Sequence, residues 1–307
     1  MQRVACWKIW ETDLKEIQPT PIFWKNGQVQ GPGQHSLSLD HPAILFGESA
    51  FETLRVEGRQ PLYLMDHLDR IERSSHGIGI STDSCRRDLE VDLQQALTDL
   101  PDSTITWRLR ITLVRSATSA RGLDVRESGL DRWLMLVPVS SPALKPIECC
   151  FSPYRKIPVE CLDPAWKHGN YLSSLVALRD ARQRGFDDAL LLSSTGALTE
   201  STSANLFWVR NDELWTCDRR LVFPGLTRAR ILQEAAEEGI PVNEGEFNEA
   251  ELLKAEEVFL TSSIRGIVPV GRIESEVFSG DHSASMTSRF TDLLRERDRL
   301  ELGRRTP

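Results

Sequence analysis

A regular alternation of apolar and polar residues in the first half of the chain is the feature that most limits its fold. Over residues 105–113 every second side chain is apolar, and threonine or arginine occupies each position between. A period of two is typical of a β-strand that buries one face. Because alternate side chains of a strand share a face, Arg108 and Arg110 are expected on the same side of a sheet.

Strand and helix patterns follow one another along the rest of the chain. Extended segments are expected at 50–56, 62–64, 133–137, 189–192, 205–209, 213–216 and 258–260. Helices are expected from a cap at Asp66 to Gly77, over 85–97, over 171–184, from an N-cap at Thr227 to Gly239, from a capping box of Asn248 and Glu251, and at the end of the chain. This mixture in two parts predicts an α+β architecture.

A segment rich in proline and serine divides the chain. Residues 139–146 read Val-Ser-Ser-Pro-Ala-Leu-Lys-Pro and follow an apolar, strand-like run. Such a composition is typical of a linker. We therefore expect an N-terminal α/β domain over residues 1–139, a linker over 140–146 and a C-terminal domain over 147–307.

Composition argues against several classes of function. The 307 residues carry a formal net charge of −8, whereas nucleic-acid binders usually have a basic surplus, so no nucleic-acid partner is expected. No apolar run is long enough to span a membrane, and the first residues lack the apolar stretch of a signal peptide. The six cysteines show no CxxC spacing and the six histidines no ligand spacing. These patterns predict free thiols in a reducing cytoplasm and no metal site.

Three local features could carry chemistry, and each also has an ordinary structural explanation. Lys167 lies between Trp166 and Gly169; an aromatic neighbour can desolvate such an amine and favour its nucleophilic form, although a lone lysine is usually solvated. Glu200 ends an extended piece beside a core strand, where a carboxylate needs a partner, unless it is a plain loop residue. Residues 225–227 and 261–263 offer backbone N–H groups to an anion, or simply cap their elements.

Seven segments occur in an order that points to one family. They are residues 45–55, 67–70, 110–115, 167–171, 200–207, 224–228 and 256–263. From about residue 43 to about residue 270 the chain resembles the class IV pyridoxal-phosphate aminotransferases, which have a two-domain α+β fold of type IV. This family includes branched-chain aminotransferases, D-amino-acid aminotransferases and 4-amino-4-deoxychorismate lyases.

The resemblance implies pyridoxal 5′-phosphate as the cofactor and a role for each matching residue. Lys167 matches the Schiff-base lysine, which bonds the cofactor aldehyde and shuttles a proton, and Glu200 matches the carboxylate that pairs with the pyridine nitrogen. Arg70 matches the arginine that binds the cofactor phosphate. The remaining cofactor-binding positions, which serve the phosphate, the ring face and the ring hydroxyl, are Leu226, Thr227, Ser263, Phe223 and Tyr171.

The resemblance leaves substrate recognition open. The implied substrate positions are Phe51, Arg108, Arg110, Ile264 and Arg265. Arg108 and Arg110 are otherwise two exposed arginines. Arg265 departs from the family, which usually has a small or apolar residue there; it would narrow the pocket or bind a second carboxylate.

The implied activity is the exchange of an amino group between an amino acid and a 2-oxo acid, as in a branched-chain aminotransferase. The alternative is a lyase that converts aminodeoxychorismate, which has two carboxylates, into 4-aminobenzoate and pyruvate. The interval from Lys167 to Asn170 is one residue shorter than in branched-chain enzymes, whereas residues 170–175 resemble theirs. A non-catalytic relative would have lost Lys167 or Glu200. A homodimer with its sites at the domain interface is also implied.

Overall fold

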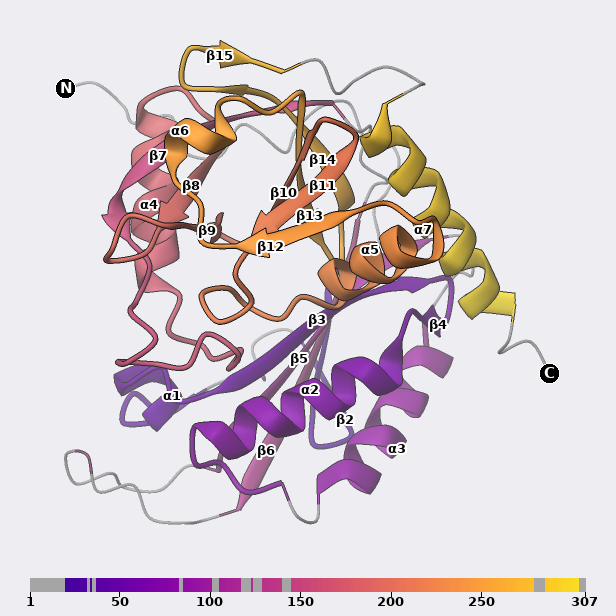
Figure 1. The fold of residues 1–307 in the computed structure, drawn as a ribbon. Helices are drawn as coiled ribbons and strands as arrows, with labels where there is room; N and C mark the ends of the chain where they lie inside the picture. Colours follow the sequence, from indigo (N-terminus) through magenta and orange to yellow (C-terminus); the bar gives the residue numbers. More distant parts are fainter. Residues whose placement is uncertain are drawn as a thin grey trace, which may run out of the picture.

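The computed structural model describes residues 20–31, 34, 37–82, 85–100, 105–116, 123, 129–139, 145–278 and 285–303. These residues build two separate sheets, the first at the bottom of Figure 1 and the second at the top. Strands of the first sheet come from the chain up to Pro138, and those of the second come from Ile147 onward. The α+β architecture expected from the sequence is confirmed.

The first sheet is antiparallel throughout, with the order β2-β1-β6-β5-β3-β4. Its strands are β1 (Ile22–Lys25), β2 (Gln28–Gln30), β3 (Ala50–Glu57), β4 (Gln60–Pro61), β5 (Thr106–Arg115) and β6 (Leu130–Pro138). The alternating segment of the sequence is β5, in which Trp107, Leu109 and Ile111 are fully buried. Arg108 and Arg110 lie between these positions and are half-buried on the opposite face.

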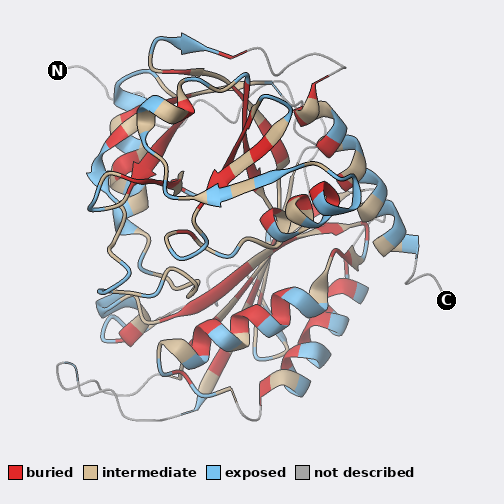
Figure 2. Cartoon of the chain, in the orientation of Figure 1, coloured by how far each residue is buried: buried red, intermediate tan, exposed pale blue. Residues whose placement is uncertain are grey.

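Two helices cover the apolar face of the first sheet. They are α2 (Leu64–Gly77) and α3 (Cys85–Thr98), and the short helix α1 (Pro42–Leu45) precedes β3. Leu68 and Ile71 on α2 pack with Leu54 of β3 in one core cluster. Figure 2 shows the buried stripe of α2 turned toward the strands, while its other side is exposed.

The second sheet mixes parallel and antiparallel pairs, in the order β12-β11-β10-β13-β14-β7-β8-β9, with β15 paired to β14. Its strands are β7 (Ile147–Arg155), β8 (Asp188–Leu192), β9 (Leu198–Ser201), β10 (Asn205–Arg210), β11 (Glu213–Cys217), β12 (Val242–Gly245), β13 (Glu257–Ser262), β14 (Gly266–Ile273) and β15 (Glu276–Val277). Helices α4 (Leu172–Gln183), α5 (Leu226–Glu237), α6 (Glu249–Leu252) and α7 (Met286–Gly303) accompany it.

Local signals in the second half are confirmed at two positions. The β10–β11 hairpin turns at Asn211 and Asp212, whose φ angles are 53° and 57°, the positive values that tight hairpin turns require. At the start of α6, Asn248 and Glu251 form both bonds of the predicted capping box. The buried clusters of this half draw on residues 149–294 and share no member with the cluster of the first half.

Two expectations about helix starts are wrong, and tertiary contacts explain the first. Segment 62–64 is not a continuous strand, because Tyr63 adopts a left-handed φ of 54°. Helix α2 begins at Leu64, so Asp66 lies inside its first turn and is not its cap. Tyr63 donates a hydrogen bond to Asp298 on α7 at 2.7 Å, and the guanidinium of Arg230 lies 3.3 Å from its ring centroid. Such contacts override local propensity.

The second wrong expectation concerns α5, whose N-cap is Gly225 rather than Thr227. A Cβ on Gly225 would lie only 2.1 Å from Oδ1 of Asn205, so the close approach of β10 requires glycine at this cap.

Most of the expected linker, residues 140–144, lies outside the described residues. Within the described part of the chain, no helix is long and apolar enough to cross a membrane.

Candidate active site

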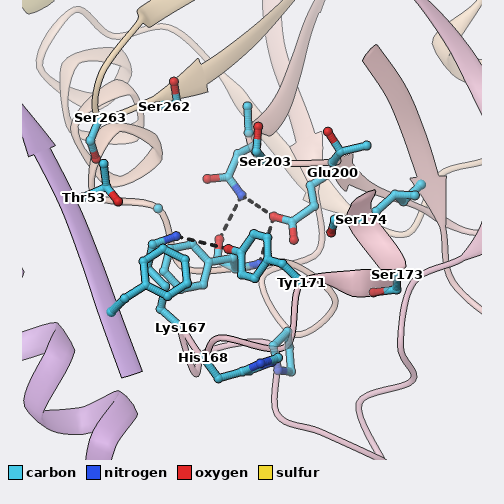
Figure 3. A pocket seen from close by; sticks show the side chains of 18 of the residues that line it. Thr53, Lys167, His168, Tyr171, Ser173, Ser174, Glu200, Ser203, Ser262 and Ser263 are labelled. Atoms are coloured by element: carbon cyan, nitrogen blue, oxygen red, sulfur yellow. Dashed lines mark hydrogen bonds between the residues drawn. The ribbon is translucent and has the colours of Figure 1, made fainter. Parts of the chain in front are cut away.

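One cavity of about 640 Å³ collects every side chain that the sequence singled out as a site residue. Phe51, Arg108 and Arg110 reach it from the first sheet, and Arg70 reaches it from α2. The other members come from the second half of the chain: Lys167, Tyr171, Glu200, Phe223, Leu226, Thr227, Ser263, Ile264 and Arg265. The cavity therefore lies where the two sheets meet (Figure 3).

The loop that carries Lys167 is fixed to the first sheet by backbone hydrogen bonds. Phe51 N–H donates to the carbonyl of Lys167 at 2.9 Å, and Gly169 N–H donates to the carbonyl of Ser49 at 2.8 Å. Lys167 N–H also donates to Oγ of Ser74 on α2 at 3.0 Å. A Cβ on Gly169 would lie 2.2 Å from Oγ of Ser49, so glycine permits this contact between the two halves.

The amine of Lys167 points into the cavity among aromatic rings (Figure 3). Its Nζ lies 4.6 Å from the ring centroid of Phe51 and 4.7 Å from that of Phe223. It donates a hydrogen bond to the hydroxyl of Tyr171 at 3.2 Å. The neighbouring His168 is half-buried; burial and then the charge of Lys167 lower the pKa of its imidazole, which favours the neutral form.

Glu200 is held across the cavity by three donors. Its Oε2 accepts hydrogen bonds from Nδ2 of Asn205 at 3.0 Å and from the backbone N–H of Phe223 at 3.1 Å. Its Oε1 pairs with the ammonium of Lys156. Sequence reasoning missed Lys156, which follows β7 and has no motif around it. The pairing meets the expectation that a carboxylate at this position needs a partner.

The start of α5 presents backbone donors to the same cavity. The N-cap, Gly225, provides no side-chain acceptor, and Leu226 and Thr227 line the cavity as the first residues of the helix. Free N–H groups and the helix dipole favour an anion at such a terminus. Oγ1 of Thr261, a residue that lines the same cavity, is buried and has no hydrogen-bond partner in the described part of the protein.

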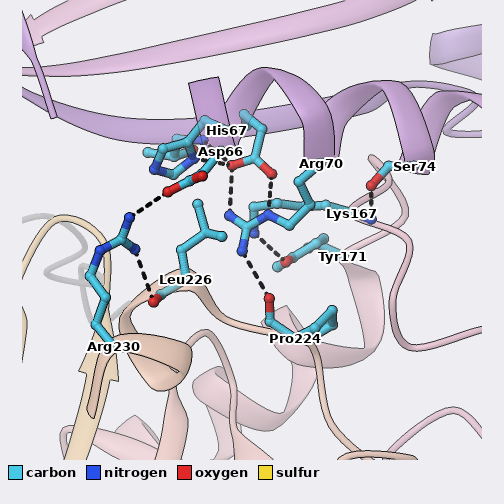
Figure 4. A network of polar contacts seen from close by, with 11 residues as sticks. Asp66, His67, Arg70, Ser74, Lys167, Tyr171, Pro224, Leu226 and Arg230 are labelled. Atoms are coloured by element: carbon cyan, nitrogen blue, oxygen red, sulfur yellow. Dashed lines mark hydrogen bonds and ion pairs between the residues drawn. The ribbon is translucent and has the colours of Figure 1, made fainter. Parts of the chain in front are cut away.

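Arg70 is the centre of a buried polar network (Figure 4). Its Nε donates to Oε1 of Glu52 at 2.6 Å and its Nη2 to Oε2 at 2.8 Å, while Nη1 donates to the carbonyl of Pro224 at 3.0 Å. His67 Nδ1 lies 2.7 Å from the same carboxylate. Burial raises the pKa of Glu52, but Arg70 and His67 outweigh it and bring the pKa to about 2.

Sequence reasoning also missed Glu52, although a signal was available. Ala50, Glu52, Leu54 and Val56 occupy the core-facing positions of β3, so a carboxylate stands in a row of apolar side chains. A buried charge at such a position implies a cationic partner. The partner itself comes from α2, which the pattern of β3 does not identify.

Several arginines that line the cavity lack an acidic partner among the residues that the structure describes. Arg108, Arg110 and Arg265 form no ion pair with any residue that the structure describes. The guanidinium of Arg110 lies 3.6 Å from the ring centroid of Phe51 and its Nε donates to Thr112 at 3.3 Å. Burial lowers the pKa of Arg110, and the charge of Arg108 lowers it further. The cavity therefore has uncompensated positive charge.

Comparisons with known proteins show the family of the chain. The family model described as amino-transferase class IV matches residues 49–273. A putative branched-chain-amino-acid aminotransferase of Methanocaldococcus jannaschii is 28% identical, with 89% of this chain and 95% of that protein covered. An aminodeoxychorismate lyase of Bacillus subtilis is 27% identical, with 87% and 91% covered.

The fold also matches solved structures. The crystal structure of a branched-chain aminotransferase from the archaeon Thermoproteus uzoniensis, with norvaline, superimposes with a TM-score of 0.83 at 23% identity, covering 92% of this chain and 95% of that one. The two-domain fold of type IV is thereby established. The chain belongs to the class IV aminotransferase family, and its cofactor is pyridoxal 5′-phosphate.

Proposed function

We propose that this enzyme exchanges an amino group between an amino acid and a 2-oxo acid, with Lys167 as the group that moves the proton. The observation that carries the proposal is the placement of one lysine amine among Phe51, Tyr171 and Phe223, across the cavity from a carboxylate fixed by three donors. Amine, carboxylate and anion-binding helix terminus are the groups that a pyridoxal-phosphate enzyme needs in one cavity.

The residues present fit the cofactor. The start of α5 offers the N–H groups of Leu226 and Thr227 to a phosphate, and the unpartnered Oγ1 of Thr261 lines the same cavity. Glu200 would hold the protonated ring nitrogen, because its other donors already keep it oriented. Phe223 would pack on the ring, Tyr171 would bond the ring hydroxyl, and Ser263 and Arg70 would complete the phosphate site.

The chain's own groups then perform the proton transfer. Pyridoxal phosphate supplies an electron-withdrawing ring that stabilises negative charge at the substrate α-carbon. The Lys167 amine acts as the general base that removes the α-proton and as the acid that returns it. Tyr171 orients this amine through the contact at 3.2 Å, and the rings of Phe51 and Phe223 exclude water from it. Over a full cycle the amino donor becomes a 2-oxo acid and the acceptor becomes an amino acid.

A lyase that releases pyruvate from aminodeoxychorismate is the second candidate. The Bacillus subtilis relative carries that name, and the arginines of the cavity suit a substrate with two carboxylates. One pair of assays separates the two. The purified holoenzyme is incubated with amino donors and 2-oxoglutarate, and separately with aminodeoxychorismate. We expect a new amino acid in the first; 4-aminobenzoate and pyruvate without transamination would reject the aminotransferase.

We also propose that the enzyme is a homodimer. Leu172 and Leu175 at the start of α4 are 61% and 45% exposed, and Ile44 and Leu45 on α1 are 47% and 50% exposed. The backbone of Asn170 approaches Gly47 just after α1, so these apolar side chains lie in one region beside the cavity. A second copy of the chain would cover them. Sedimentation equilibrium tests this, and a monomer at micromolar concentration would contradict it.

Two further proposals concern location and domain limits. Cys85, Cys149, Cys150, Cys161 and Cys217 are all free thiols, the state that a reducing cytoplasm maintains. We place the enzyme in the cytoplasm, and fractionation of cells tests this placement.

We also place the domain boundary at residues 140–146, between the last strand of the first sheet and the first strand of the second. Limited proteolysis followed by mass spectrometry tests that boundary.

A further inference from the structure

Two arginines hold the backbone around the start of α5 (Figure 4). Nη1 of Arg70 donates to the carbonyl of Pro224 at 3.0 Å, and Nη1 of Arg230 donates to the carbonyl of Leu226, also at 3.0 Å. Gly225, the N-cap, lies between these two carbonyls. Arg230 lines a second cavity, of about 620 Å³, rather than the active-site cavity. It therefore reaches the active site through the backbone that it binds.

The hydrogen bond from Arg230 acts on a donor of the active site. The carbonyl of Leu226 and the N–H of Thr227 belong to one planar peptide group, so they point in opposite directions. A hydrogen bond to the carbonyl fixes the orientation of this group and polarises its N–H. Thr227 lines the active-site cavity, where it is proposed to offer that N–H to the cofactor phosphate. The guanidinium thus makes the peptide group a better oriented and stronger donor.

The charge of Arg230 lies where the helix alone would not favour it. The first turn of α5 reads Leu-Thr-Arg-Ala and has no acidic residue, and the side chain of Arg230 folds back by four residues onto this turn. The helix dipole is already positive at an N-terminus, so a cation there is unfavourable unless an anion accompanies it. A phosphate with two negative charges would be such an anion.

Residues at the start of α2 hold Arg230 in place. Its Nη2 donates to Oδ2 of Asp66 at 2.7 Å, and its guanidinium lies 3.3 Å from the ring centroid of Tyr63. Tyr63 in turn donates to Asp298 of α7 at 2.7 Å. Burial and then this hydrogen bond raise the pKa of the Tyr63 phenol, so the ring beside the cation stays neutral. The side chain of Arg230 is only 12% exposed, so water competes little for its hydrogen bonds.

We infer that Arg230 is a positioning residue for the cofactor phosphate, and that Asp66 and Tyr63 hold it in this role from the first half of the molecule. The inference rests on the proposed placement of the phosphate at the start of α5. Arg230 orients and polarises the peptide group of Thr227 and adds positive charge behind it. Removal of the guanidinium would weaken binding of a ligand that has the phosphate and spare a ligand that lacks it.

Cofactor binding with and without the phosphate tests this role. The full-length enzyme is freed of cofactor and titrated with pyridoxal phosphate and with pyridoxal. The ratio of the Kd for pyridoxal to the Kd for pyridoxal phosphate is compared in the wild type, Arg230→Met and Arg86→Met. Arg86 is the control, because it also pairs with an acid of α2, Asp69 at 3.0 Å, but belongs to α3 and lines neither cavity.

The two variants should differ clearly. We expect the ratio to fall about tenfold in Arg230→Met, the size of one charged hydrogen bond, and to keep the wild-type value in Arg86→Met. An unchanged ratio in Arg230→Met would overturn the inference. An equal fall in Arg86→Met would overturn it as well, because the effect would then follow general loss of stability.

A mutant cycle tests whether Asp66 acts through Arg230. Asp66→Asn should lower the same ratio less than Arg230→Met does, and the double variant should match Arg230→Met, because the two residues share one interaction. Additive losses would show that Asp66 does not act through Arg230 and would contradict that part of the inference.

Both measurements follow binding without turnover, so they separate this inference from the proposed function. If the ratio falls in Arg230→Met but the wild type converts no amino acid, the proposed function fails and the inference stands. If the wild type converts amino acids and the ratio is unchanged in Arg230→Met, the proposed function stands and the inference is wrong.

Discussion

Arg70 and Glu52 form a two-pronged ion pair inside the first half of the molecule, with donor–acceptor distances of 2.6 and 2.8 Å. The Glu52 side chain is fully buried and that of Arg70 is 4% exposed. The charge of Arg70 is thus balanced before any anion enters the cavity. The pair attaches α2 to β3 and aims the guanidinium at the loop before α5 (Figure 4).

Replacing Glu52 by glutamine leaves Arg70 as a buried charge without an ionic partner. Loss of one member of a buried pair typically costs about 3–5 kcal/mol, so the free energy of unfolding, measured in urea, should fall by that order. Glu57→Gln on the same strand is the control, because Glu57 is 33% exposed and pairs with Arg55 near the surface; it should cost less than about 1 kcal/mol. Equal losses in the two variants would refute a special role for the buried pair.

The same carboxylate predicts how stability depends on pH. Glu52 has a pKa near 2 in the folded protein, against an ordinary value of 4.5, so the unfolded chain binds the proton more readily between these values. The stabilising contribution is complete above pH 4.5 and is lost as the pH falls toward 2. Burial also lowers the pKa of His67 below 6.5. The unfolded chain therefore protonates this imidazole more readily, and the stabilising contribution of His67 also falls as the pH falls. Urea titrations from pH 7 to pH 3 should show a shallower decline below pH 4.5 in Glu52→Gln than in the wild type.

Lys156 should act as a positioning residue through Glu200. Lys156→Met removes the ammonium that pairs with Oε1 of Glu200, and loss of a charged hydrogen bond should lower kcat about ten- to a hundredfold. The KM for the amino donor should change little, because Glu200 is proposed to touch the cofactor ring and not the substrate. Lys156→Arg should recover most of the rate. If KM rises in Lys156→Met while kcat is unchanged, or if Lys156→Arg does not recover the rate, Lys156 serves substrate binding instead.

Gly225 should not tolerate a larger side chain. A Cβ there would lie 2.1 Å from Oδ1 of Asn205, whose amide also supports Glu200. Gly225→Ala should therefore displace Asn205 or the start of α5, cost about 1–3 kcal/mol in stability and weaken binding of pyridoxal phosphate. Gly303→Ala at the end of α7 has open space around it and should leave both quantities unchanged. Thermal unfolding and equilibrium dialysis measure the two effects.

The residues that the sequence singled out line one cavity, and they were found through short segments that resemble one family, with local patterns as support. Strand β5 shows its buried face as a strict alternation, and the loop around Lys167 is a short segment whose glycine and aromatic residues are adjacent in the chain. Lys156 and Glu52 were not predicted as site residues, because their roles depend on partners from distant elements, β9 and α2. The start of α2 was misplaced for the same reason, since Tyr63 is fixed by contacts with α7 and Arg230. Only the fold brings these groups together.

Lys167 is proposed to carry the cofactor, and the cavity offers a direct internal comparison, because Lys156 and Lys167 both line it. The holoenzyme is reduced with borohydride, digested and mapped by mass spectrometry to locate the pyridoxyl group. Lys156 is engaged with Glu200, whereas Lys167 presents its amine beside the hydroxyl of Tyr171. We expect the label on Lys167 alone, and no label in Lys167→Ala. A label on Lys156, or a protein that takes up no pyridoxal phosphate, would contradict it.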